Sequence, residues 1–129
     1  MEGNPSGYFW QDNVILIGED EIINFRLLEV MLAKTKVKLL HGRTGRETLQ
    51  IFKDNPTIDL VLIDIKMPEM DGCEVTREIR KINQQVPIIA QTAFALELER
   101  IKALEAGCNA YLTKPIMQNK LLEMIGSFL

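Results

Sequence analysis

The sequence predicts a doubly wound α/β fold, in which a five-stranded parallel sheet carries helices on both faces. Short apolar runs alternate with helical patterns along the chain, and parallel strands require helical crossovers of this kind. Four of the apolar runs are continuous rather than alternating with polar residues, which is typical of strands buried on both faces. Together these observations indicate an open sheet with both faces covered.

The first part of the pattern contains two strands and two helices. Residues 14–17 and 37–41 are apolar runs rich in strand-forming residues. Residues 44–52 begin with a threonine that has a glutamate three residues on, which is the capping-box pattern of a helix start. Residues 21–34 have apolar side chains at helical spacing, which predicts one apolar face made of Ile23, Leu27, Val30 and Met31.

The second part repeats the alternation of strand and helix three times. Asp71 has a glutamate three residues on, so we interpret it as a helix cap rather than as a ligand. Gly107 has the residue type that commonly ends a helix. The expected strands are residues 60–63, 87–91 and 110–113, and the expected helices are residues 71–82, 96–107 and 117–129.

The length of 129 residues indicates one domain. Residues 1–13 have the composition of a linker or of a segment left by cloning, and residues 14–129 form the expected domain. No apolar run approaches the roughly 20 residues of a membrane span, and no signal-peptide pattern is present. We therefore expect a cytoplasmic domain without membrane contact of its own, which also fits the cytoplasmic part of a membrane-bound sensor.

Composition argues against several other functions. The net charge is −3 and the 15 basic residues are scattered, so direct binding of nucleic acid is not expected. Cys73 and Cys108 lack the spacing of a zinc site or a disulfide framework. His41 has no neighbouring metal-binding residue in the sequence, and we expect it to be structural or exposed.

Chemically reactive side chains follow the strands, where each strand ends. Glu19 and Asp20 follow the first strand, Asp64 the third, Thr92 the fourth and Lys114 the fifth. Carboxyl ends of parallel strands meet at one edge of a sheet, so these side chains should converge. Clustered carboxylates repel one another unless a cation joins them, and their oxygen atoms suit Mg²⁺. Because no Gly-rich phosphate loop is present, the carboxylate itself could be the group that receives a phosphoryl group.

Four segments resemble the receiver domain of response regulators in two-component signalling: "ILIGEDE", "LIDIKMPEMDG", "PIIAQTA" and "AYLTKP". The resemblance covers residues 14–129. It implies the flavodoxin-like (CheY-like) strand order 2-1-3-4-5 and a role in phosphorelay signal transduction. It further implies that Asp64 accepts a phosphoryl group from a phosphohistidine of a histidine kinase or a histidine phosphotransfer protein.

The same resemblance assigns roles to the other site residues. It implies that Mg²⁺ is held by Asp20, by Asp64 and by the main-chain carbonyl of Lys66. Glu19 stands where an aspartate is commoner, so we expect it to reach the metal through a water molecule.

Three further residues receive roles from the resemblance. Thr92 and Lys114 should bind the phosphoryl oxygens, and Tyr111 should change rotamer with the state of the site. The Lys114–Pro115 peptide bond is expected to be cis. Phe94 and Lys66 should flank the path of the attacking water, and neither residue type can act on that water as a base, which predicts slow dephosphorylation.

The wider context is predicted from the lead-in "YFWQDN", which resembles the linker before the receiver of a hybrid sensor histidine kinase. The domain itself is expected to have only self-phosphorylation and self-dephosphorylation activity, and phosphorylation could promote a dimer.

Two alternatives remain at this point. A phosphohydrolase that forms an aspartyl phosphate would want a second carboxylate two residues after Asp64, where the chain has Lys66. A flavin carrier on the same topology would want a hydroxyl-rich loop after the first strand, where the chain has "GEDE".

Overall fold

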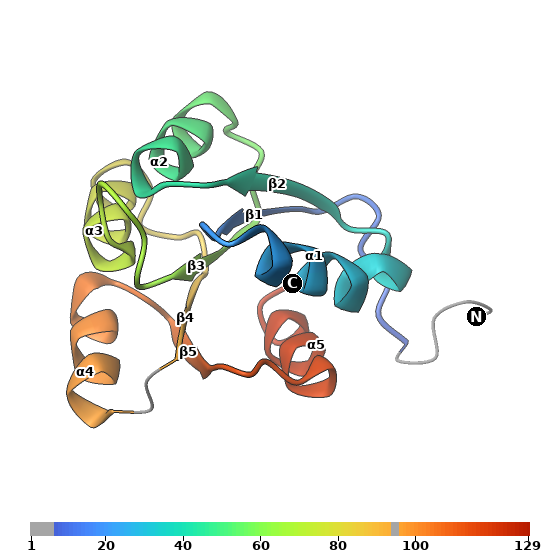
Figure 1. The fold of residues 1–129 in the computed structure, drawn as a ribbon. Helices are drawn as coiled ribbons and strands as arrows, with labels where there is room; N and C mark the ends of the chain where they lie inside the picture. Colours follow the sequence, from blue (N-terminus) through green and yellow to red (C-terminus); the bar gives the residue numbers. More distant parts are fainter. Residues whose placement is uncertain (1–6, 94–95) are drawn as a thin grey trace.

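The computed structural model describes residues 7–93 and 96–129. Within these ranges one sheet contains five parallel strands in the order β2-β1-β3-β4-β5, which confirms the predicted fold class and strand order (Figure 1). The strands are β1 (Val14–Gly18), β2 (Lys38–Gly42), β3 (Leu60–Asp64), β4 (Ile88–Thr92) and β5 (Ala110–Thr113). The helices are α1 (Ile22–Leu32), α2 (Gly45–Asp54), α3 (Gly72–Ile82), α4 (Glu97–Ala106) and α5 (Gln118–Gly126), with a short 3₁₀ helix η1 (Ala33–Thr35) after α1.

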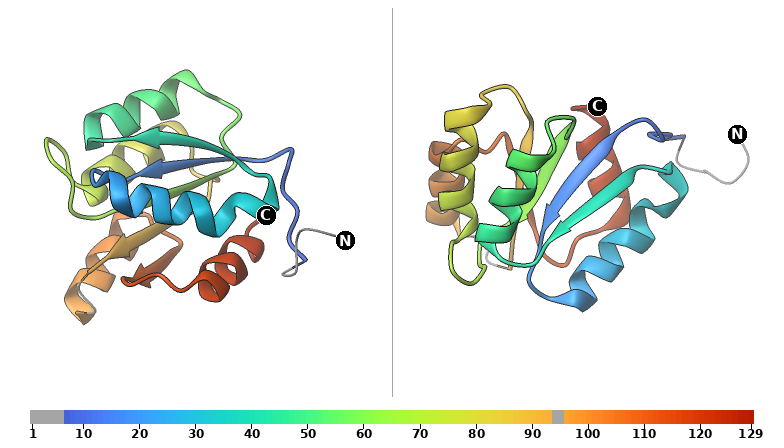
Figure 2. Two further views of the ribbon diagram at one scale, coloured as in Figure 1. Left: turned by 45° about the vertical axis from the view of Figure 1, so that its right-hand side comes forward. Right: turned by 90° about the horizontal axis from the view of Figure 1, so that it is seen from above.

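Helices cover both faces of the sheet, α1 and α5 on one face and α2, α3 and α4 on the other (Figures 1 and 2). Successive strand residues point to opposite faces, so Leu60 and Leu62 of β3 join the core under α1 and α5, whereas Val61 and Ile63 join the other core. All five residues of β3 are buried. The burial of this central strand on both sides explains why its sequence is continuously apolar.

The predicted apolar face of the first helix is wrong. Ile23, Leu27 and Val30 are 79%, 49% and 71% exposed, although Met31 packs at the edge of the core. The helix instead buries Phe25, Leu28 and Leu32. These three residues also have helical spacing, so α1 is apolar on two faces, and the sheet can cover only one of them.

The predicted helix caps are confirmed. Thr44 accepts a hydrogen bond from the Glu47 amide at 3.0 Å. Asp71 forms a full capping box, accepting from the Glu74 amide at 2.9 Å while its own amide donates to the Glu74 side chain at 3.2 Å. Asp71 is therefore engaged in starting α3, as expected.

The segment before β1 packs onto the domain from residue 8 onward. Trp10 is buried in the core beneath α1 and α5, and its amide donates to the Thr35 carbonyl at 2.7 Å. The Tyr8 ring lies 5.2 Å from the Trp10 ring, centroid to centroid. Residues 1–6 of the expected linker lie outside the described residues, as does Phe94.

No helix in the described part of the chain combines the length and the apolarity that crossing a membrane requires.

Candidate functional site

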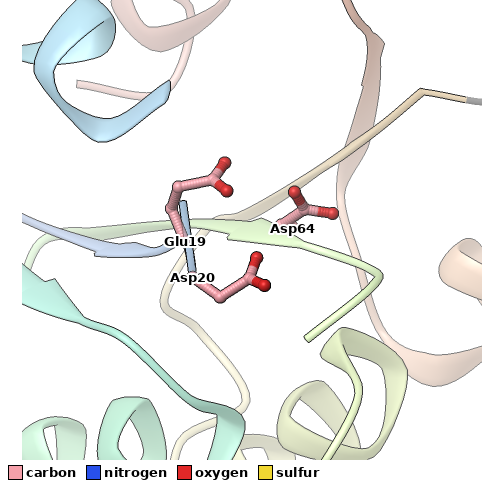
Figure 3. Close-up of side chains that lie close together, drawn as sticks. All are labelled: Glu19, Asp20 and Asp64. Carbon is pink, nitrogen blue, oxygen red and sulfur yellow. The ribbon is translucent and has the colours of Figure 1, made fainter. Parts of the chain in front are cut away.

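Three carboxylates converge at the carboxyl edge of the sheet (Figure 3). Glu19 and Asp20 lie in the loop between β1 and α1, and Asp64 is the last residue of β3. Each offers an oxygen atom, and these atoms all lie within 4.8 Å of one another. Glu19 and Asp64 are buried and Asp20 is exposed. The pairing of β1 with β3, in which Gly18 lies opposite Ile63, brings the loop beside Asp64.

Both oxygens of the Asp64 carboxylate accept hydrogen bonds. Oδ1 accepts from the amide of Lys66 at 3.0 Å, and Oδ2 accepts from Nζ of Lys114 at 2.5 Å. The chain then forms a turn in which Glu69 has a φ of 71°. The Gly72 amide closes the turn by donating a hydrogen bond to the Ile65 carbonyl at 2.8 Å. α3 begins only after this turn and is capped by Asp71, so Asp64 does not act as a helix cap.

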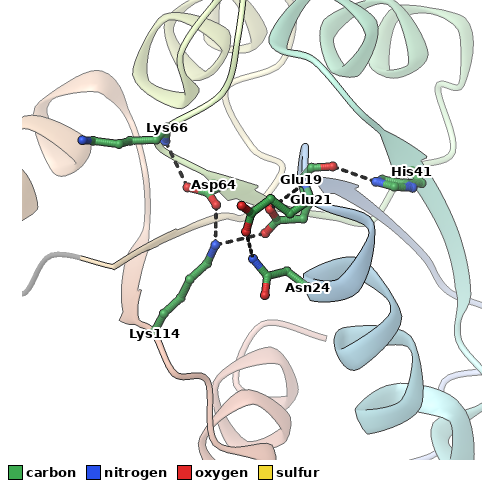
Figure 4. Close-up of polar contacts among 7 residues, drawn as sticks. All are labelled: Glu19, Glu21, Asn24, His41, Asp64, Lys66 and Lys114. Carbon is green, nitrogen blue, oxygen red and sulfur yellow. Dashed lines mark hydrogen bonds and ion pairs between the residues drawn. The ribbon is translucent and has the colours of Figure 1, made fainter.

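Lys114 pairs with two of the three carboxylates (Figure 4). Its Nζ lies 2.5 Å from Asp64 Oδ2 and 3.2 Å from Glu19 Oε1. Burial lowers the pKa of Lys114, but the hydrogen bond and charge of Asp64 and those of Glu19 outweigh it, so its pKa is raised. The predicted cis bond between Lys114 and Pro115 is present, and the Lys114 amide donates to the Thr92 carbonyl at 2.7 Å.

Burial makes the ionised form of Glu19 costly. Burial raises its pKa, and the charge of Asp64 raises it further, while the amide of Glu21 and the ammonium of Lys114 act in the opposite direction. The Glu21 amide lies 3.2 Å from Glu19 Oε2. Three ionised carboxylates beside one ammonium leave two negative charges uncompensated, which is the charge that one divalent cation carries.

The donor set fits a hard divalent cation. A cavity of about 220 Å³ opens at the cluster, lined by Asp20, Glu21, Asp64, Lys66, Ala93 and Lys114. One water molecule occupies about 30 Å³ in the liquid, so the cavity has room for a cation with several of its waters. Mg²⁺ prefers oxygen ligands and usually retains water. The residues present therefore fit Mg²⁺.

Thr92 and Tyr111 are brought together beside this cluster. Thr92 is buried at the end of β4, and Tyr111 is half-buried on β5. Burial raises the pKa of the Tyr111 phenol, and a hydrogen bond with the Thr92 side chain acts in the opposite direction. The two residues expected to act as a switch are thus in direct contact.

The structure brings Glu19, Asp20, Asp64 and Lys114 together as the sequence predicts. The amide of Lys66 contacts Asp64, while its side chain points away from the cluster (Figure 4).

Sequence reasoning missed two contacts around the carboxylate cluster. His41 Nε2 lies 2.8 Å from the Glu19 carbonyl oxygen, and the Asn24 amide donates to Glu21 Oε1 at 2.6 Å. The parallel pairing of β1 with β2 was the available signal for the His41 contact, because it makes the ends of these two strands neighbours.

Comparisons with known proteins agree on one family. A family model described as response regulator receiver domain matches residues 15–126. The polar-differentiation response regulator DivK of Brucella ovis is 32% identical over 117 residues, which cover 89% of this chain and 94% of that protein.

Solved structures give the same result. One is a co-crystal structure of the Saccharomyces cerevisiae histidine phosphotransfer protein Ypd1 with the receiver domain of Ssk1. Its matching chain has a TM-score of 0.84 and 31% identity, covering 90% of this chain and 88% of that chain. Another is the receiver domain of the sensor histidine kinase PA1611 from Pseudomonas aeruginosa, with a magnesium ion coordinated in its active site cleft. It has a TM-score of 0.83 and 33% identity, covering 90% of this chain and 96% of that chain.

Proposed function

The chain belongs to the response regulator receiver domains of two-component signalling, and from this premise we propose that Asp64 is its phosphoacceptor. The observation that carries the proposal is the position of this side chain. Asp64 ends a fully buried strand, does not cap a helix, lines the cavity at the cluster, and accepts a hydrogen bond from Lys114 Nζ at 2.5 Å. The family assignment sets aside the phosphohydrolase and flavin-carrier alternatives.

The proposed reaction transfers a phosphoryl group from a phosphohistidine to Asp64. A carboxylate oxygen of Asp64 attacks the phosphorus atom, a phosphorus–oxygen bond forms, and the phosphorus–nitrogen bond of the donor breaks, so that the imidazole leaves with the electron pair and takes up a proton. Negative charge on the transferring group must be stabilised at fixed positions. Lys114 is placed to exchange its contact with Asp64 for one with a phosphoryl oxygen.

We propose that Asp20 and Asp64 bind Mg²⁺ directly, together with the main-chain carbonyl of Lys66, and that Glu19 binds it through water. The cluster and its two uncompensated charges support this proposal. When bound, Mg²⁺ would neutralise charge on the phosphoryl oxygens. Asp20 and Asp64 both line the cavity at the cluster, whereas Glu19 does not, which supports a contact through water for Glu19.

Thr92 and Tyr111 are proposed to report the state of the site. The Thr92 hydroxyl is the group expected to donate to a phosphoryl oxygen. The Thr92 side chain also forms a hydrogen bond with Tyr111, so a movement of the Thr92 hydroxyl towards a phosphoryl oxygen would alter that contact. This coupling supports a movement of the Tyr111 ring on phosphorylation.

The phosphodonor is proposed to dock on α1. Ile23, Leu27 and Val30 form an exposed apolar stripe on this helix, and Met117 is 57% exposed beside α5. A groove of about 330 Å³ connects this surface with the site, because both Leu27 and Lys114 line it. A donor must bring its phosphohistidine to Asp64, so an apolar surface adjoining the site suits it.

A histidine kinase or a histidine phosphotransfer protein is the donor we propose. A parent hybrid sensor kinase in the cytoplasm and a phosphorylation-dependent dimer remain proposals that rest on the sequence resemblance.

The test of the phosphoacceptor uses a small donor, so that docking plays no part. Acetyl phosphate with Mg²⁺ should add one phosphoryl group to the wild-type protein, seen by intact-mass spectrometry, and none to Asp64→Asn. Asp71→Asn is the matched control, because it neutralises a nearby loop carboxylate and asparagine still caps a helix. Labelling of Asp64→Asn at the wild-type rate would contradict the proposal.

A further inference from the structure

The backbone amide and the backbone carbonyl of Glu19 both form hydrogen bonds with residues of strand β2. Its amide donates to the Gly42 carbonyl at 3.0 Å. Its carbonyl oxygen lies 2.8 Å from Nε2 of His41 (Figure 4). A carbonyl oxygen can only accept, so the imidazole donates from Nε2. The loop that holds two of the three clustered carboxylates is therefore attached to the neighbouring strand by one backbone hydrogen bond and by one side chain, that of His41.

The His41 ring is itself held in place. It lies flat against the ring of Phe25, with centroids 3.7 Å apart and an interplanar angle of 1°. Phe25 is buried in the core beneath α1, and His41 belongs to β2, where it lies opposite Ile17 of β1. The donor nitrogen thus has a fixed position relative to both the sheet and α1.

The contact acts on the peptide that joins Glu19 to Asp20. A peptide unit is planar and includes the Cα atom of Asp20, so a hydrogen bond to its oxygen restrains the orientation of the unit that carries the Asp20 side chain. The other end of the loop is held by the Glu21 amide, which donates to the Glu19 carboxylate at 3.2 Å. Groups that orient the ligands of a metal site contribute to its affinity for the metal.

We infer that His41 is a positioning residue of the Mg²⁺ site, acting through the Glu19 carbonyl. The inference rests on the proposed function, since it concerns the metal site of that proposal. His41 touches neither the metal nor the phosphoryl group, and its effect is to hold the loop that carries Glu19 and Asp20.

Two variants separate the donated hydrogen bond from the packing of the ring. His41→Phe keeps a ring against Phe25 but removes the donor, and His41→Gln keeps a nitrogen donor near the position of Nε2 but removes the ring. Mg²⁺ affinity is measured by titration of backbone amide signals. His41→Phe should bind Mg²⁺ roughly tenfold more weakly, at the low end of the range for residues that orient ligands. His41→Gln should stay within about threefold of wild type.

A second measurement needs no metal. In the metal-free protein the Glu21 amide hydrogen, which is bonded to Glu19, should exchange with solvent faster in His41→Phe than in wild type or His41→Gln. Equal Mg²⁺ affinity in His41→Phe and wild type would overturn the inference, and so would equal losses in both variants, which would indicate packing alone. If wild type itself bound no Mg²⁺ and accepted no phosphoryl group, the proposed function would fail instead.

Discussion

Replacing Lys114 with methionine should destabilise the metal-free domain and raise its affinity for Mg²⁺. Nζ of Lys114 contacts Asp64 at 2.5 Å and Glu19 at 3.2 Å, and both carboxylates are buried. Methionine preserves most of the apolar stem and removes the charge. The two carboxylates then repel each other without the ammonium that compensates them, and a divalent cation becomes the partner that can relieve the repulsion.

The size of the effect follows from burial. Removing one partner of a fully buried ion pair costs about 3–5 kcal/mol. The Lys114 side chain keeps 21% of its surface exposed, and water can reach the vacated position, so we expect a loss of about 2–3 kcal/mol. In a domain of 129 residues this loss corresponds to a fall of roughly 6–12 °C in the unfolding midpoint.

Thermal unfolding followed by the fluorescence of Trp10, the single tryptophan, measures the loss in EDTA and in excess Mg²⁺. Mg²⁺ should restore more stability to Lys114→Met than it adds to wild type, because the stabilisation by a bound ligand increases with the logarithm of its affinity. Lys120→Met, which removes an exposed ammonium from α5, is the control and should change stability by less than about 0.5 kcal/mol. The reasoning is refuted if Lys114→Met loses no more than this control, or if it binds Mg²⁺ more weakly than wild type.

Three further predictions concern the metal, the lifetime of the phosphoryl group and the donor. Asp20→Ala should largely abolish the amide shifts of a Mg²⁺ titration and Glu19→Gln should only weaken them; equal losses would make Glu19 a direct ligand. Phe94→Glu should lose its phosphoryl group faster than wild type after the donor is removed, because a carboxylate can orient water and an aromatic ring cannot. Each kcal/mol removed from the barrier would speed this loss roughly fivefold. Unchanged or slower decay would contradict this prediction. Ile23→Glu should slow phosphotransfer from a phosphorylated histidine phosphotransfer protein by about tenfold and leave the rate with acetyl phosphate unchanged, since it places a charge in the apolar docking surface; equal slowing with both donors would argue against docking on α1.

The fold was predictable because the apolar runs, the helical patterns and their alternation along the chain all indicated the same architecture. β3 is apolar at every position before Asp64, and the structure buries it on both faces. The site followed from topology, because strands that run in parallel place Asp64, Thr92 and Lys114 at one edge, however far apart they lie in sequence.

The buried face of α1 and the contact of His41 with the site could not be predicted, because they depend on distances between elements that a sequence does not contain. α1 carries apolar residues on two faces, and only the docked helix shows that Phe25 faces the sheet and Ile23 faces solvent. The bond between His41 and the Glu19 carbonyl depends on the register of β1 against β2 and on the stacking of His41 on Phe25. Neither is visible in a single histidine among apolar neighbours.

The central claim is that Asp64 receives the phosphoryl group, and mapping the modified residue tests it most directly. A histidine phosphotransfer protein that is already phosphorylated on its histidine would transfer the phosphoryl group to the wild-type chain in Mg²⁺. Borohydride would then reduce the acyl phosphate to an alcohol, and peptide mass spectrometry would locate the product. The account predicts homoserine at position 64 and unmodified residues at positions 19 and 20. Reduction at Glu19 or Asp20, with position 64 unmodified, would contradict it.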